Sequence, residues 1–99
     1  MSKPTQLPTR RGYSIFCPTL FQGTMTACYD ETDYPVVFET ELEAQREIAD
    51  NQLIRIRQFL DGERDFHDAI TTEEFVLPVD VWPDGSISIE GGRVYGKAP

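Results

Sequence analysis

The strongest pattern of hydrophobic and polar positions lies between Glu39 and Gly62. On a helical wheel of about 100° per residue, its apolar side chains fall in one arc about half the circumference wide, and most charged side chains fill the opposite arc. Thr40 and Glu43 have the spacing of a capping box, and Gly62 supplies the left-handed residue that commonly ends a helix. We therefore predict an amphipathic helix over residues 41–61, whose core-facing arc is Leu42, Ala44, Ile48, Ala49, Leu53, Ile56, Phe59 and Leu60.

Two glutamines interrupt this apolar arc. Gln45 and Gln52 lie among its hydrophobic positions, and a buried amide without hydrogen-bond partners costs about 1–3 kcal/mol. Either this flank of the helix is open and meets a second protein chain, or the two amides reach the rim of the helix or bond to the sheet. Both interpretations stay open here.

Alternating polar and apolar residues over 12–29 predict a β-hairpin. A two-residue turn at Gln22-Gly23 would place Cys17 opposite Cys28, close enough for a redox-dependent disulfide. Two free, half-buried thiols are the other interpretation, because disulfides are rare in the cytosol. The face of this hairpin that we expect to be buried carries Phe16, Pro18, Leu20, Met25, Ala27 and Tyr29.

A second hairpin is predicted over residues 72–90. Its loop, Pro83-Asp84-Gly85, is typical of three-residue turns with a left-handed glycine. This loop sets Val81 opposite Ile87 and Val79 opposite Ile89. These four side chains, together with Phe75 and Leu77, would then form one buried face.

The remaining segments are short. Residues 34–38 form a short predicted strand before the helix, and the i, i+3, i+4 spacing of Phe66, Ala69 and Ile70 predicts a second helix over residues 65–70. The fold class that follows is α+β: a small antiparallel sheet of two hairpins and a short strand, packed on one long amphipathic helix with a short second helix. We expect one domain over 12–92, a flexible basic tail over 1–11 and a frayed C-terminus over 93–99.

The charge of the chain is strongly negative and unevenly distributed. The 99 residues carry a formal charge of −8. Residues 30–50 hold eight acids against Arg46 alone, and residues 61–84 hold eight against Arg64 alone. Such a surface repels nucleic-acid phosphates and attracts basic proteins, although net charge also serves solubility alone. No apolar run reaches the roughly 18 residues of a membrane span and no signal peptide opens the chain, so we expect a cytoplasmic protein without membrane contact.

Candidate chemistry is sparse. The single histidine, His67, lies among acidic residues, but a calcium loop starting at Asp61 would place Phe66 where glycine is needed. Neither Cys17 nor Cys28 has a basic neighbour on its strand to activate it as a nucleophile. We found no glycine-rich phosphate loop and no aromatic platform interleaved with basic residues. We therefore expect no enzyme, metal or cofactor, and a small enzyme or metal protein using His67 is the least favoured alternative.

Scattered positions resemble small acidic antitoxins of the HicB kind. They are Gly12, Tyr13, Pro18 and Gly23, followed by Thr40, Glu43 and Ala44. The resemblance is confined to these positions, so it identifies no family. It makes an antitoxin one alternative for the function.

Our hypothesis from the sequence is a small acidic protein-binding module whose partner has a basic surface. Its sharpest form is an inhibitor from a phage or mobile element that mimics DNA and occupies a nucleic-acid-binding surface, as anti-defence proteins do. The alternatives are an antitoxin or a dimerising structural or regulatory subunit. The candidate partner-binding residues are Asp30, Glu31, Asp33, Glu39, Glu41, Glu43, Asp61, Glu63, Asp65 and Asp68.

Overall fold

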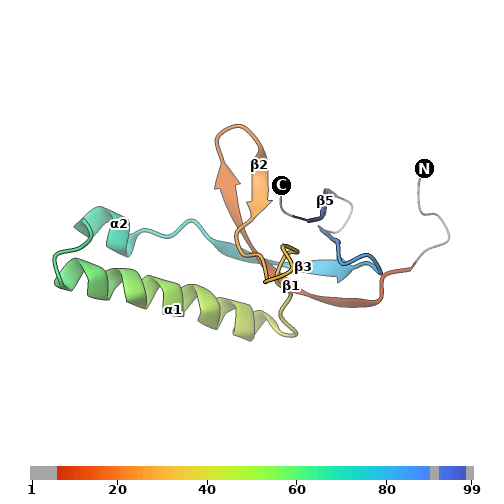
Figure 1. The fold of residues 1–99 in the computed structure, drawn as a ribbon, viewed down its shortest axis with the longest axis horizontal. Coiled ribbons are helices and arrows are strands. Elements are labelled where there is room, and N and C mark those ends of the chain that lie inside the picture. Colours follow the sequence, from red (N-terminus) through yellow and green to blue (C-terminus); the bar gives the residue numbers. More distant parts are fainter. Residues whose placement is uncertain (1–6, 90–91, 98–99) are drawn as a thin grey trace.

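The protein has the predicted α+β fold, in which an antiparallel sheet is joined to one long helix and one short helix (Figure 1). The computed structural model describes residues 7–89 and 92–97. Within them, the sheet has the strand order β2-β1-β3-β4-β5. The strands are β1 (Arg10–Thr19), β2 (Gly23–Thr26), β3 (Phe75–Val81), β4 (Ile87–Ile89) and β5 (Val94–Tyr95), and the helices are α1 (Glu41–Leu60) and α2 (Phe66–Ile70).

The main hydrophobic core lies between the strands of the curled sheet. Its buried members are Phe16, Val79, Val81, Ile87 and Tyr95. The rings of Phe16 and Tyr95 meet edge to face with centroids 5.3 Å apart, a geometry that aromatic pairs prefer. Because full burial of one large apolar side chain contributes about 1.5–3 kcal/mol, these few residues supply much of the stability of the sheet.

Side chains of β5 and of the residue just before it join the two edges of the sheet. The Tyr95 hydroxyl donates a hydrogen bond of 2.7 Å to the Thr24 carbonyl oxygen in β2, although β5 and β2 stand at opposite ends of the strand order. Arg93 also donates to the Gln22 carbonyl oxygen, and its guanidinium lies 5.4 Å from the Tyr95 ring centroid. The sheet must therefore curl until its edges approach each other, and it buries its own inner face.

The ends of α1 form as the sequence predicts. Thr40 Oγ1 accepts a hydrogen bond from the Glu43 amide, and the Glu43 carboxylate accepts one from the Thr40 amide, which completes the capping box. Gly62 follows the last turn with φ = 82°. The short helix α2 begins after Asp65, whose side chain accepts from the Asp68 amide.

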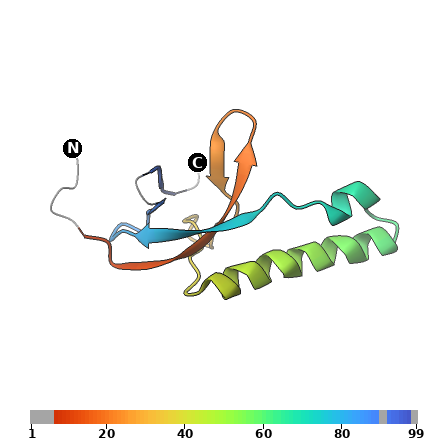
Figure 2. The same cartoon turned by 180° about the vertical axis from the view of Figure 1, so that it is seen from behind.

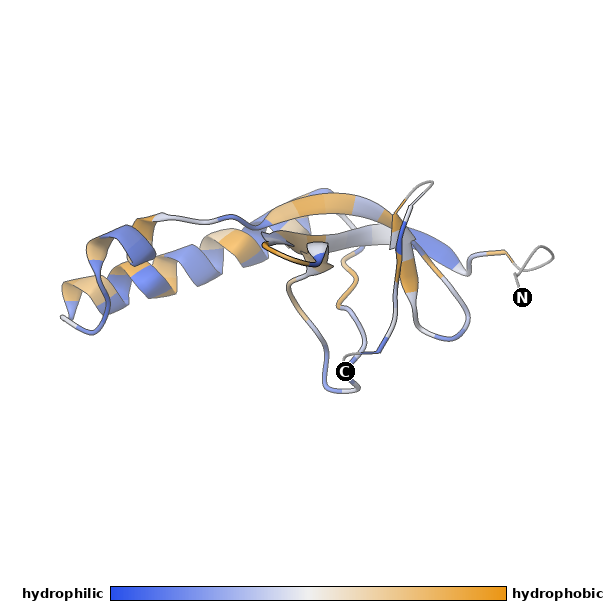
Figure 3. Ribbon diagram, turned by 90° about the horizontal axis from the view of Figure 1, so that it is seen from above, coloured by the Kyte–Doolittle hydropathy of each residue, from blue (hydrophilic) through white to orange (hydrophobic). Residues whose placement is uncertain are grey.

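Helix α1 projects from the sheet. Only its N-terminal part runs beside the sheet, while the remainder extends away and is covered on one side by α2 and the segment that leads back to β3 (Figures 1 and 2). We call α1 and α2 together the helical arm. The hydropathy colouring shows hydrophobic and hydrophilic residues alternating along this arm (Figure 3).

The second hairpin has the predicted register. Val79 pairs with Ile89, and Val81 pairs with Ile87, while the loop glycine, Gly85, adopts φ = 93°. Val79 and Ile87 are fully buried. Phe75, expected on the same buried face, is 36% exposed because it stands at the start of β3, away from β4.

The predicted register of the first hairpin is wrong. The turn contains three residues, Leu20 to Gln22, so Thr19 pairs with Gly23 and Cys17 faces Met25 instead of Cys28. The longer turn is stabilised by the Thr19 hydroxyl, which donates to the Gly23 carbonyl oxygen and accepts from the Gln22 amide. A left-handed Gly23, with φ = 71°, lets the chain enter β2 directly.

This shift moves the tip of the first hairpin into solvent. Leu20, which we expected on the buried face, is 91% exposed, and its neighbour Phe21 is 95% exposed. The short strand predicted over 34–38 is also absent. That segment makes two isolated bridges, Tyr13 with Phe38 and Tyr29 with Pro35.

The chain is ordered beyond the predicted domain limits. β1 begins at Arg10, and Arg11 forms an ion pair with Asp80 at 3.2 Å. At the other end, β5 lies inside the segment that was expected to be frayed, and Tyr95 is only 5% exposed. Residues 1–6, 90–91 and 98–99, which the predicted domain limits include, lie outside the described residues.

The capping box gives a first stability prediction. Thr40→Ala removes the acceptor for the Glu43 amide, so the free energy of unfolding should fall by about 1 kcal/mol in urea denaturation. Thr71→Ala, at an exposed threonine after α2, is the matched control and should change it by less than about 0.5 kcal/mol. Equal losses in the two variants would contradict the assigned role of the cap.

The link between the sheet edges gives a second prediction. Tyr95→Phe keeps the buried ring but removes the hydrogen bond to Thr24, so it should cost about 0.5–1.5 kcal/mol. Tyr95→Ala also leaves a cavity beside Phe16 and should cost about 3–5 kcal/mol. Urea unfolding of both variants measures the difference, and a Tyr95→Ala protein as stable as Tyr95→Phe would show that the ring is not part of the core.

Candidate functional site

Seven of the ten predicted acidic residues lie in two groups at the two ends of α1 (Figure 1). Glu39, Glu41 and Glu43 precede and begin the helix, and Asp61, Glu63, Asp65 and Asp68 follow it up to α2. The other three, Asp30, Glu31 and Asp33, lie in the loop between β2 and α1, where Asp30 lines a separate hollow with Arg10 and Gly85. A helix of 20 residues is about 30 Å long, so the groups do not merge into a single cluster. All ten residues are exposed: Asp30, Glu31, Asp33, Glu39, Glu41, Glu43, Asp61, Glu63, Asp65 and Asp68.

Four of these carboxylates are used by the local structure. Asp30 accepts hydrogen bonds from the Thr32 hydroxyl at 2.6 Å and the Thr32 amide at 2.8 Å, and these bonds hold its pKa below the usual value. Its contribution to stability is therefore present at neutral pH and is lost as the pH falls through this lowered pKa. Glu43 and Asp65 cap the two helices, and Asp68 is paired with Arg64.

The other six carboxylates make no hydrogen bond or ion pair with the described residues. They are Glu31, Asp33, Glu39, Glu41, Asp61 and Glu63. These side chains are therefore the ones with charge available to a partner.

Half of the predicted apolar arc of α1 faces solvent. Ala44 is fully buried, and Ile48, Ile56 and Phe59 are partly buried. The other flank of the arc is not covered, because the sheet reaches only the start of α1 and α2 packs on a single side (Figures 1 and 2). We call this line of apolar residues the α1 seam. It contains the exposed Leu42, Ala49, Leu53 and Leu60 and, at its border with the covered flank, the partly buried Ile56.

The exposed fractions along the seam are large. Leu42 is 59% exposed, Leu53 is 48% exposed and Leu60 is 73% exposed. The steps of seven, four, three and four residues between members are those of the a and d positions in a coiled-coil heptad, with Arg46 at the one intermediate position that is not apolar. The sequence pattern therefore located the arc but not the half of it that stays uncovered.

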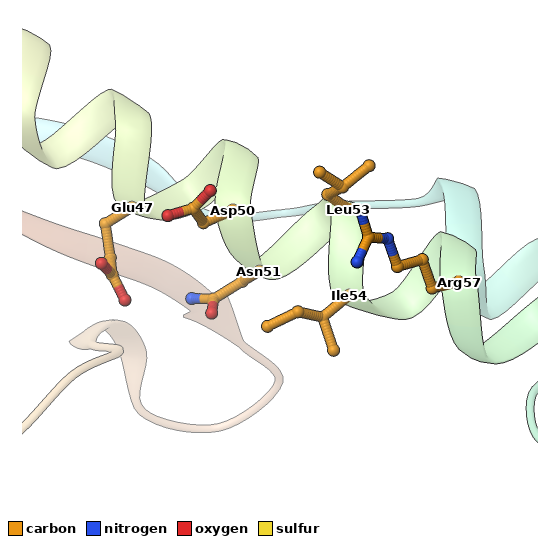
Figure 4. Close-up of a pocket in the computed structure, with 6 residues that line it drawn as sticks. All are labelled: Glu47, Asp50, Asn51, Leu53, Ile54 and Arg57. Carbon is orange, nitrogen blue, oxygen red and sulfur yellow. The ribbon is translucent and has the colours of Figure 1, made fainter.

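Beside the seam, the surface of α1 has a hollow of about 310 Å³. Figure 4 shows two carboxylates, from Glu47 and Asp50, at one end of the hollow and Arg57 at the other end. No hydrogen bond or ion pair joins these three side chains to the described part of the protein. The complete lining is Glu47, Asp50, Asn51, Leu53, Ile54 and Arg57.

The two glutamines of the arc have different surroundings. Gln52 donates from Nε2 to the Ala69 carbonyl oxygen at 2.6 Å and accepts from Arg55 at 2.9 Å. It therefore fixes α2 against α1. Gln45 is exposed. Of the two amides, only that of Gln45 therefore lies on an open flank of the helix.

The thiols of Cys17 and Cys28 are free. Burial raises the pKa of the Cys17 thiol, and the carboxylates of Glu74 and Glu73 add to this shift. Burial also raises the pKa of Cys28, with further contributions from Glu74, Glu47 and Cys17. Raised pKa values lower the thiolate fraction, which is the opposite of what a nucleophilic cysteine requires.

Other candidate chemistry is not brought together. His67 lies on α2 and is exposed. Among the residues that the structure describes, no three histidine, cysteine or acidic side chains are grouped as a metal site would need. Within residues 7–89 and 92–97, neither helix combines the length and apolar content that crossing a bilayer requires.

The thiol environment gives a third prediction. Glu74→Gln removes a negative charge near both sulfurs, so each thiol should react about two- to fivefold faster with a disulfide reagent at pH 8. The rate of each thiol is measured alone, in a Cys28→Ser or a Cys17→Ser background. Glu73→Gln is the control, and it should accelerate the reaction of Cys17 but not that of Cys28. Equal rates before and after Glu74→Gln would show that this carboxylate does not act on the thiols.

Comparison with known proteins leaves the chain without an assigned family. No protein-family model, no curated protein and no solved structure matches it.

Proposed function

We propose that this chain is a non-enzymatic protein-binding module of the cytoplasm and that it binds through the outer face of α1. The observation that carries the proposal is the α1 seam, where three leucines between 48% and 73% exposed stand in one line. Large apolar side chains aligned on one face of a helix are typical of surfaces that another protein covers. The seam thus supports a partner-binding role for the helical arm.

Charge supports a partner with basic patches. Four of the free carboxylates flank the seam, Glu39 and Glu41 at one end and Asp61 and Glu63 at the other, and complementary charge increases the rate at which partners meet. A more specific form of the proposal is an inhibitor that covers the nucleic-acid-binding surface of its partner. Because the two acidic groups are separated by the length of α1, such a partner needs two basic patches about 30 Å apart.

A second candidate function is dimerisation through the flank with Gln45 and Gln52. The hydrogen bonds of Gln52 to α2 weigh against this form, because they leave only Gln45 free for a second chain. An antitoxin role stays an alternative, since an antitoxin would also bind its toxin through a protein surface.

Capture from the native host tests the proposal. The tagged full chain is compared with Leu53→Gln/Leu60→Gln, which makes the seam polar at exposed positions. Leu20→Gln/Phe21→Gln is the matched control, because it also replaces two exposed apolar residues. We expect mass spectrometry to find a protein that the wild type and the control retain and that the seam variant loses by about tenfold or more.

The same captured protein tests the role of charge. Its association rate should fall by about tenfold or more between roughly 0.05 M and 0.5 M salt if the acidic groups steer the encounter. An identical set of captured proteins for all three chains would contradict the proposal. An association rate that does not change with salt would contradict the part of the proposal that gives the partner a basic surface.

A further inference from the structure

We infer that the α1 seam receives a basic amphipathic helix from its partner, and that the hollow lined by Glu47 and Asp50 receives a lysine or arginine of that helix. This inference rests on the proposed function and names the chemistry of the partner. It is drawn from the spacing of the seam, the shape of the hollow and the charges on either side.

The spacing of the seam favours a helix as the occupant. From Ala49 to Leu60 its members follow the alternating steps of four and three residues that bring one helix face against another. Leu42, in the first turn, lies one heptad before Ala49, with Arg46 between them. A partner helix of similar length can therefore place an apolar side chain against each turn of α1 except the one that carries Arg46.

The hollow has the chemistry that a long cationic side chain needs. Leu53 and Ile54 offer apolar surface to an aliphatic stem, and such stems pack on apolar surface while the charged head stays near water or an acid. Glu47 and Asp50 lie at one end of the hollow (Figure 4) and have no ion pair within the described residues. An ammonium or guanidinium group at that end meets two free carboxylates.

A second copy of this chain fits the seam less well. When two α1 helices lie antiparallel with full overlap, Leu42 of one faces Leu60 of the other. The two Asp50 side chains then approach each other, although Glu43 of each helix lies near Arg57 of the other. Each copy also carries a net charge of −8. Two copies therefore repel each other over the whole molecule, whereas a basic helix meets opposite charge.

The test uses a synthetic 21-residue helical peptide with leucine at the a and d positions and lysine at e and g. Binding to the full chain is measured by fluorescence anisotropy. One comparison peptide has the same composition with scrambled leucines, and another has glutamate in place of lysine. We expect the lysine peptide to bind at least about tenfold more tightly than either comparison peptide.

Variants of the protein locate the binding. Leu53→Gln/Leu60→Gln should weaken the affinity for the lysine peptide by about tenfold, and Leu20→Gln/Phe21→Gln should leave it within about twofold. Glu47→Lys/Asp50→Lys should weaken it more than Glu31→Lys/Glu73→Lys, which changes the net charge equally at other exposed acids. Circular dichroism and urea unfolding establish that each variant retains the fold.

Three results would overturn the inference. Equal affinity for the scrambled peptide, or no effect of the seam variant, would show attraction by net charge alone. Equal losses of peptide affinity in the two lysine variants would show that the hollow does not receive a cationic side chain of the peptide. A dimer in sedimentation that the seam variant dissociates would make a second copy the occupant. In that last case, or if a host protein is captured through the seam without binding of the peptide, the proposed function stands and only the partner's chemistry is wrong.

Discussion

The contact of Tyr95 with Phe16 and Thr24 is the interaction on which the shape of this protein depends. It places the last strand against the second strand, so the sheet curls and buries its own inner face. In a flat sheet of this size, a helix would have to cover that face. Here the strands themselves close most of the core, so most of α1 does not cover the inner face of the sheet. The exposed arm is thus a consequence of how the sheet is closed.

Local signals in the sequence were sufficient for several elements. The capping box of Thr40 and Glu43, the left-handed Gly62 and the loop around Gly85 each act within a few residues, and all three appear as predicted. One failure depends on contacts between distant segments, and the other on hydrogen bonds within a single turn. Tyr95 needs Phe16 and Thr24, far earlier in the chain, to make β5 part of the core. The first hairpin could close at either turn length, and the hydroxyl of Thr19 decides for the longer one.

The candidate site was predictable only in part, for a related reason. Charge segregation located the acidic segments, and all ten residues are exposed, but the distance between Glu41 and Asp61 follows from α1 being continuous between them. The amphipathic pattern of α1 likewise identified its apolar positions. It could not show that the sheet runs beside only the N-terminal part of α1, because the coverage of a helix depends on the width of the sheet that packs against it. The seam therefore became visible only when both parts were placed in space.

Separation of the closed sheet from the arm has a consequence for the evolution of this protein. Leu53 and Leu60 keep about half or more of their surface in solvent, so replacing them should leave the folded scaffold nearly untouched. Under the proposed function, the binding surface could therefore change in sequence while Phe16, Val79 and Tyr95 stay the same. Descendants with the same scaffold would then be expected to engage unrelated targets.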